Sequence, residues 1–122
     1  MSDDPVSRMF EWWNAAFAGT GFSAEGFAPH FADDAELIVN GQRRALGRAE
    51  IARHFEAVRA AAQSATVKLP LLRCLRQGDA MFVHYRVDAI VNGGAEAEEA
   101  MAYVALADGR IALMDVLSRA LD

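Results

Sequence analysis

The segment from Ala80 to Val91 carries the residues that are best suited to acid–base chemistry. In an extended strand its residues alternate between faces, which places His84, Arg86 and Asp88 on the same side. Residues two apart on one face lie side by side, so Arg86 and Asp88 can form an ion pair. A cation that holds a carboxyl group beside a substrate oxygen suits proton transfer. We therefore predict Asp88 as the acid or base, Arg86 as the residue that orients it, and His84 as an auxiliary proton carrier.

These three side chains also fit a structural interpretation. If the opposite, apolar face of the strand packs in a core, the polar face is exposed to solvent and its ion pair contributes little to stability. If the polar face lines a pocket, His84 can still be a hydrogen-bonded wall residue and not a base. The sequence leaves both interpretations open, and the orientation of this strand decides between them. We expect the polar face to line a pocket.

The remaining polar residues favour structural roles. His30 and His54 lie in or near expected helices beside phenylalanines, where a partly buried, hydrogen-bonded histidine is the usual case. The chain's three histidines lack the spacing of metal ligands, so we predict no metal site and no cofactor. Three acidic residues are expected at a solvated strand end near the pocket mouth: Glu96, Glu98 and Glu99.

Helices dominate the first half of the predicted fold. A helix is expected from Pro5 to the Gly19-Thr20-Gly21 stop, with Asp3 and Asp4 as capping residues. Its apolar residues recur at helical spacing. The elements that follow are a short helix from Ser23 to about Phe31, a strand from Ala35 to Asn40 with a hairpin turn at Asn40-Gly41, a second short strand, and a long helix from Gly47 to Gln63.

Turn signals divide the chain from Ala65 onward into four antiparallel strands. Long strands that are joined by tight turns must twist and curl, and helices fill only part of a curled sheet. We therefore predict an α+β fold over residues 1–122: a cone-shaped, strongly bent antiparallel sheet of about six strands, with three helices that enclose a pocket.

Composition restricts the class of partner. Hydrophobic residues make up 53% of the chain and the net charge is −5, with no run of basic residues. This balance argues against nucleic acid and against a membrane surface as partners. The acidic N-terminus lacks the features of a signal peptide, and Cys74 is the only cysteine. We therefore expect a cytoplasmic protein.

Two motifs carry a resemblance to a known family. The string Phe31-Ala32-Asp33-Asp34-Ala35, followed by a hairpin and by Gly47-Arg48-x-x-Ile51-x-x-x-Phe55, resembles the nuclear-transport-factor-two-like superfamily. The strand entry Gly109-Arg110-Ile111 resembles its SnoaL-like branch. The resemblance implies a cone-shaped α+β fold that is commonly dimeric. Steroid isomerases, polyketide cyclases, epoxide hydrolases, dehydratases and non-enzymatic binders share this fold, so it does not define an activity.

The segment Tyr85-Arg86-Val87-Asp88 also resembles the Arg-x-Asp element of limonene-type epoxide hydrolases, in which this Asp protonates the epoxide. The Tyr and Asn that hold water in that family correspond here to Leu37 and Val39. The family's second Asp corresponds to Val116, and Asp115 would face inward only if one residue were deleted or bulged.

The steroid-isomerase pattern matches less well. Its proton-transferring positions correspond to Trp12, Val39 and Ala102, none of which can move a proton. We therefore do not expect that activity.

These observations predict a small-molecule pocket protein for an apolar, oxygen-bearing ligand. One interpretation is a cofactor-independent hydrolase, cyclase or isomerase, and the alternative is a non-catalytic ligand-binding or dimerisation module. A homodimer through the convex face of the sheet is expected. The predicted catalytic residues are Asp88, Arg86, His84 and Asp115. The predicted pocket wall comprises Trp12, Leu37, Val39, Phe55, Phe82, Ala102, Met114 and Val116.

Overall fold

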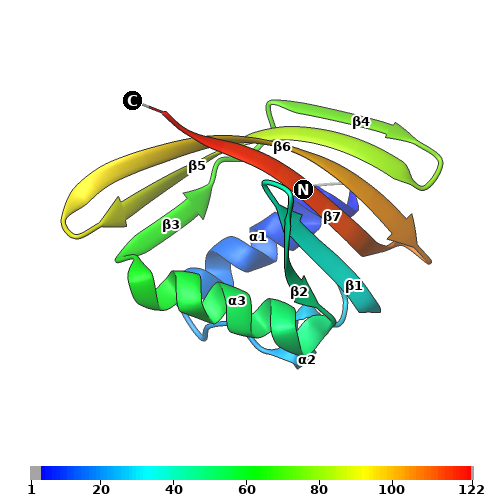
Figure 1. Ribbon diagram of the computed structural model, residues 1–122, viewed down its shortest axis with the longest axis horizontal. Coiled ribbons are helices and arrows are strands. Elements are labelled where there is room, and N and C mark those ends of the chain that lie inside the picture. Colours follow the sequence, from blue (N-terminus) through cyan, green and yellow to red (C-terminus); the bar gives the residue numbers. More distant parts are fainter. Residues whose placement is uncertain (1–3, 122) are drawn as a thin grey trace.

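The computed structural model describes residues 4–121, which form three helices and a seven-stranded sheet (Figure 1). The helices are α1 (Pro5–Ala18), α2 (Ala24–Phe27) and α3 (Arg48–Ala61). The strands are β1 (Phe31–Val39), β2 (Gln42–Leu46), β3 (Ser64–Val67), β4 (Arg73–Gln77), β5 (Ala80–Val91), β6 (Gly94–Ala107) and β7 (Arg110–Leu121).

The sheet has the strand order β2-β1-β7-β6-β5-β3, and β4 pairs with the first half of β5 beside β3. All pairings are antiparallel except that of β1 with β7, which is parallel. The sheet arches over the helices, which lie on its concave side (Figure 1). This arrangement confirms the predicted α+β fold with a strongly bent sheet.

Local signals explain where the elements begin. The Asp4 carboxylate accepts a hydrogen bond of 2.8 Å from the Ser7 N–H, and Pro5 follows at the first helical position. The other predicted capping residue, Asp3, lies outside the described residues. Asn40 and Gly41 have φ values of 50° and 82°, as the tight turn between β1 and β2 requires.

The short second helix differs from the prediction. It ends at Phe27, and Phe31 already begins β1. The side chains of Phe27 and Phe31 are both fully buried, and their rings meet edge to face with centroids 5.3 Å apart. Burial of the Phe31 side chain beneath the sheet is therefore achieved from a strand and not from a helix.

The sheet contains seven strands where about six were expected. The segment after Ala65 was predicted as one strand, but it divides into β3 and β4 around Pro70. Proline lacks the N–H that a continuous sheet ladder needs, so an edge strand breaks there. Both pieces pair with the same edge of β5.

The core lies between the concave face of the sheet and the helices. Its largest fully buried side chains come from every layer: Val6, Met9, Phe27, Phe31, Ile51, Met81, Val104 and Ile111. Phe22 and Phe55 join Phe27 in an aromatic cluster with ring centroids less than 6 Å apart. Each fully buried apolar side chain contributes about 1.5–3 kcal/mol relative to exposure.

Candidate functional site

A cavity of about 390 Å³ lies between α1, α3 and the concave face of the sheet. Its walls are mostly apolar, and they include Met9, Phe10 and Trp13 of α1. Five of the residues predicted for the pocket wall line this cavity: Leu37, Val39, Phe55, Met114 and Val116. Strand alternation explains these positions on β1 and β7, where residues two apart share a face.

The other predicted wall residues lie elsewhere. Phe82 is 59% exposed on the convex face of the sheet, where its ring lies 5.3 Å from that of Tyr103. Trp12 packs against the rings of Phe27 and His30, between α1 and α2. Ala102 is buried in the core cluster and is not part of the cavity wall.

Tyr85 supplies a hydroxyl to the cavity. Its side chain lies on the apolar face of β5, is 6% exposed, and packs on the ring of Phe10 at 4.8 Å. Among the described residues, none accepts from or donates to this hydroxyl. Burial raises the pKa of Tyr85, and the nearby carboxylate of Glu98 raises it further. The hydroxyl therefore stays protonated at neutral pH and can donate a hydrogen bond to a ligand.

Trp13 brings a second polar group to the cavity wall. Its Nε1 atom is buried and has no hydrogen-bond partner in the described part of the chain. Its ring meets that of Phe55 edge to face, with centroids 5.7 Å apart. A buried N–H without a partner is costly, which marks this end of the cavity as unusual within the core.

Carboxylates lie at the mouth of the cavity. Glu96 and Glu98 project from the concave face of β6, and both are exposed. Glu98 pairs in register with Val87, which makes it a diagonal neighbour of Tyr85 on β5. His54 of α3 also lines the cavity, and burial together with the charge of Arg44 lowers its pKa, so this imidazole is neutral at pH 7.

The predicted pair of Arg86 and Asp88 forms, but it does not face the cavity. The Arg86 Nε–H donates to Oδ1 of Asp88 at 2.9 Å, and Lys68 Nζ lies 3.8 Å from the other carboxylate oxygen. The side chains of Arg86 and Asp88 are 49% and 41% exposed. Because Tyr85 and Val87 point into the cavity, alternation along β5 directs these two residues to the convex face. The pair therefore does not line the concave cavity as expected; it lines an open hollow on the convex side instead.

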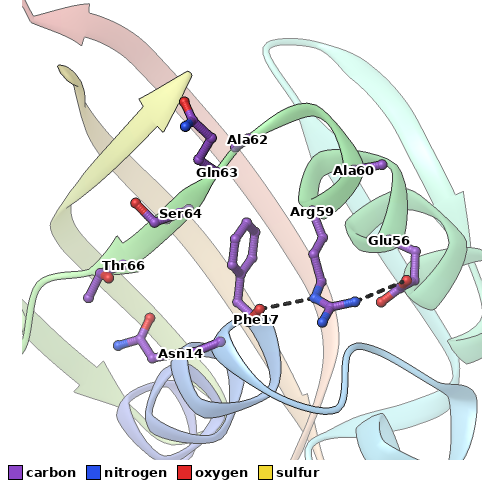
Figure 2. A pocket seen from close by; sticks show the side chains of 11 residues that line it. Asn14, Phe17, Glu56, Arg59, Ala60, Ala62, Gln63, Ser64 and Thr66 are labelled. Carbon is purple, nitrogen blue, oxygen red and sulfur yellow. Dashed lines mark hydrogen bonds and ion pairs between the residues drawn. The ribbon is translucent and has the colours of Figure 1, made fainter. Parts of the chain in front are cut away.

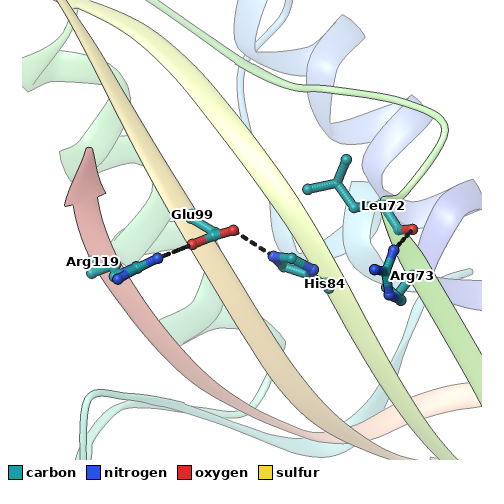
Figure 3. A network of polar contacts seen from close by, with 5 residues as sticks. All are labelled: Leu72, Arg73, His84, Glu99 and Arg119. Atoms are coloured by element: carbon teal, nitrogen blue, oxygen red, sulfur yellow. Dashed lines mark hydrogen bonds and ion pairs between the residues drawn. The ribbon is translucent and has the colours of Figure 1, made fainter. Parts of the chain in front are cut away.

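His84 belongs to a network on the same convex face (Figure 3). Its Nε2 atom lies 2.7 Å from Oε2 of Glu99, and Arg119 donates to Oε1 of Glu99 at 2.7 and 3.0 Å. These contacts lower the pKa of Glu99, the Arg119 hydrogen bond most. Asp115 also lies on the convex face, paired in register with Tyr103. None of the predicted catalytic residues therefore reaches the cavity.

A second cleft lies between the ends of α1 and α3 and strand β3 (Figure 2). Its polar side chains serve the fold. Arg59 donates to the carbonyls of Phe17 and Gly19 at 3.0 and 2.8 Å, which caps the end of α1. Asn14 exchanges two hydrogen bonds with the backbone of Val67, at 2.9 and 2.8 Å. Arg59 and Asn14 are therefore engaged in holding α1 against β3 and α3.

Sequence reasoning placed Glu96, Glu98 and Glu99 near the pocket mouth. Glu96 and Glu98 lie there, but Glu99 lies on the convex face, and Tyr85 was not singled out. The available signal was its position on β5: it is the one residue with a hydroxyl on a face that otherwise carries Met81, Val83 and Val87. A hydroxyl on an otherwise apolar strand face requires a partner or a cavity.

A bent sheet with three helices on its concave side, two of which enclose an apolar cavity against it, is the fold of the nuclear-transport-factor-two-like class. The SnoaL-like domain family matches residues 6–114, and the chain belongs to that family. Among proteins with curated descriptions, none matches the chain.

Solved structures support this fold at low sequence identity. A nuclear-transport-factor-two-like protein of unknown function from Exiguobacterium sp. 255-15 has a TM-score of 0.74 and 19% identity, over 97% of this chain and 98% of that one. A protein from Catenulispora acidiphila with a ketosteroid isomerase-like fold, in complex with trimethylamine, has a TM-score of 0.73 and 17% identity over 98% and 86%. A proposed polyketide cyclase from Sinorhizobium meliloti has a TM-score of 0.69 and 23% identity over 94% of each chain.

Within residues 4–121, no helix has both the length and the apolar character needed to cross a membrane.

Proposed function

We propose that this protein binds a small, largely apolar molecule in the cavity between α1, α3 and the concave face of the sheet. The observation that carries the proposal is the hydroxyl of the buried Tyr85 side chain, which faces an apolar cavity and has no partner among the described residues. A ligand oxygen or nitrogen would complete its hydrogen bonding. The cavity volume of about 390 Å³ lies in the range that is usual for small-molecule sites.

Two relatives support a small organic ligand. The Catenulispora protein was solved with trimethylamine, and the Sinorhizobium protein is described as a proposed polyketide cyclase. Neither is close enough in sequence to transfer its ligand to this chain. They do agree with a site that is shaped for an organic molecule and not for a macromolecule.

The binding test uses naphthylmethanol, a neutral apolar probe with one hydroxyl, and isothermal titration calorimetry. Ala61 is exposed at the end of α3 and lines the cavity, so Ala61→Trp should block entry without disturbing the core. Ala57→Trp is the matched control, because Ala57 is exposed on the same helix and lines no described cavity. We expect about a tenfold loss of affinity for Ala61→Trp and no change for the control. Equal binding by both variants would contradict the proposal.

A second candidate function is cofactor-independent acid–base catalysis of the cyclase or isomerase type. The observation that favours it is the closeness of Glu98 to Tyr85, since a carboxylate and a neutral hydroxyl can act as base and hydrogen-bond donor on one substrate. Glu98 would take the proton, and Tyr85 would stabilise the oxygen anion. With an active substrate in hand, Glu98→Gln should lower kcat at least a hundredfold, since general acid–base groups contribute roughly 10²–10⁴ in rate.

The same proposal includes a homodimer and a cytoplasmic location. The convex face carries Leu75, Phe82, Met101 and Leu117, which are 58–67% exposed on four adjacent strands. Exposed apolar side chains on four adjacent strands are typical of an interface, and a self-complementary face suits a twofold dimer. The single cysteine, Cys74, is exposed and agrees with a reducing compartment.

A further inference from the structure

The charged side chains in the wall of the cavity are of one sign. Glu96 and Glu98 are the charged side chains of its wall, and no Lys or Arg contributes to that wall among the described residues. Neither carboxylate has an ion-pair or hydrogen-bond partner in residues 4–121. By contrast, the acids on the convex side of the same strands, Asp88 and Glu99, are both paired with arginine.

The groups that face these carboxylates do not neutralise them. His54 is neutral at pH 7, because burial and the charge of Arg44 lower the pKa of this imidazole. Ser118 of β7, on the cavity wall, carries no charge. Lys68 approaches Asp88 on the convex side, so its charge is already engaged there. Arg44 acts on His54 but does not line the cavity, so Glu96 and Glu98 are the charged groups that a ligand meets in the wall.

The interior of the cavity is suited to a cation as well. The rings of Phe10, Trp13, Phe55 and Tyr85 all contribute to the wall. Aromatic faces attract cations through their quadrupole, most strongly where water is excluded. Tyr85 is more than nine-tenths buried and its hydroxyl has no protein partner, which independently indicates a ligand in this cavity.

We infer that the ligand is a lipophilic cation: a protonated amine on an apolar body. Its nitrogen lies at Glu96 and Glu98, where the ammonium N–H groups donate to the carboxylates and to the Tyr85 hydroxyl oxygen, and its body lies against Phe10 and Trp13. This inference rests on the proposed function, since it requires that the cavity binds small molecules. It goes beyond the proposed function by specifying the charge of the ligand, which the size and apolar walls of the cavity do not determine.

The test compares three probes of one shape: naphthylmethylamine, which is protonated at pH 7, neutral naphthylmethanol and anionic naphthoate. Their dissociation constants are measured by calorimetry at low salt and again at 0.5 M salt. We expect the amine to bind about tenfold more tightly than the alcohol at low salt, and the naphthoate most weakly, since the carboxylates attract the ammonium group and repel the naphthoate. High salt should reduce the difference by screening.

The double variant Glu96→Gln/Glu98→Gln should remove the preference for the amine while the alcohol still binds. The matched control is Asp79→Asn/Asp108→Asn, which removes the same charge from turns at the opposite end of the sheet. This control should keep the preference for the amine, because it lowers the net negative charge equally but leaves Glu96 and Glu98 in place. A preserved preference would show that the net charge of the protein does not cause it.

The outcomes separate the inference from the proposed function. If the alcohol binds and Ala61→Trp prevents this binding, but the amine binds no more tightly than the alcohol, then the inference of a cationic ligand is wrong. The proposed small-molecule site would still be supported. A preference for the amine that survives Glu96→Gln/Glu98→Gln also overturns the cation site. If none of the three probes binds, the proposed function fails, and the inference fails with it.

Discussion

His84 and Glu99 lie 2.7 Å apart across β5 and β6, and they sit among the exposed apolar side chains of the convex face. In the sheet register His84 pairs with Met101, and Met101 pairs with Leu117. The next row of the face holds Glu99 beside Arg119. The proposed dimer interface thus contains a polar network within an apolar surface. The acidic residue of this network is Glu99, whose pKa is lowered.

Replacement of Glu99 should change how stability depends on pH. Hydrogen bonds from Arg119 and His84 lower the pKa of Glu99 from 4.5. A carboxyl group with a lowered pKa in the folded state stabilises the protein above pH 4.5, and this contribution is lost as pH falls through the lowered value. The melting temperature of Glu99→Gln should therefore be lower than that of the parent at pH 7, and the difference should shrink by pH 3. Glu98→Gln, which loses no ion pair, is the control. A constant difference across this range would contradict the assignment.

Tyr85 should make the protein sensitive to alkali. Burial raises the pKa of its hydroxyl above the ordinary value of 10.0. A group with a raised folded pKa stabilises the protein fully below the unfolded value and loses this contribution as pH rises beyond it. The parent should therefore lose stability above about pH 10, and Tyr85→Phe should lose less. Tyr103→Phe, on the convex face, serves as the control and should behave like the parent. Urea unfolding between pH 8 and pH 11 measures the effect.

A charge on the convex face should separate the proposed dimer. Met101 is 58% exposed at the centre of the apolar surface, and Met101→Glu would bury an unpaired carboxylate in an interface. Light scattering should give the parent twice the chain mass of 13.3 kDa and the variant the single mass. Ala57→Glu is the control, because Ala57 is exposed on α3, away from the convex face, and this variant should keep the mass of the parent. A monomeric parent at high micromolar concentration would rule out the dimer.

Phe27 should be among the most sensitive positions of the core. Its side chain is fully buried and contacts the rings of Trp12, Phe22 and Phe55. We expect Phe27→Ala to lower the free energy of unfolding by about 3–5 kcal/mol, as for other large-to-small core changes. Leu72→Ala should change it by about 0.5 kcal/mol or less, because Leu72 is 52% exposed. Denaturant titration of both variants provides the measurement.

The sequence predicted the elements of this fold better than the direction of its side chains. Alternation along β5 correctly separated Tyr85 and Val87 from Arg86 and Asp88. It did not indicate which of these faces is concave, because both faces of the strand carry large apolar residues. That choice depends on where α1 and α3 pack, which is a long-range property.

The direction of side chains on the last strand, β7, was equally hard to predict from the sequence. Asp115 remained ambiguous because a bulge on β7 could reverse its side. The structure does contain a register shift opposite Ala105 and Leu106, and Asp115 still faces outward beside Tyr103. A bulge changes the phase of a strand without leaving a clear signal in its sequence. The division of β3 from β4, in contrast, had such a signal in Pro70.

The parallel pairing of β1 with β7 has a consequence for the order of folding. Phe31 pairs with Ile111, so two strands that are neighbours in the sheet are separated by most of the sequence. Contacts of such long range form late, because the entropy of closing the loop opposes them. Until β7 inserts, β1 and β6 both present unpaired edges, which are sites of aggregation. A nascent or truncated chain that lacks β7 would therefore be prone to aggregation. Its cavity would also be open on one side, since Met114 and Val116 of β7 form part of the cavity wall.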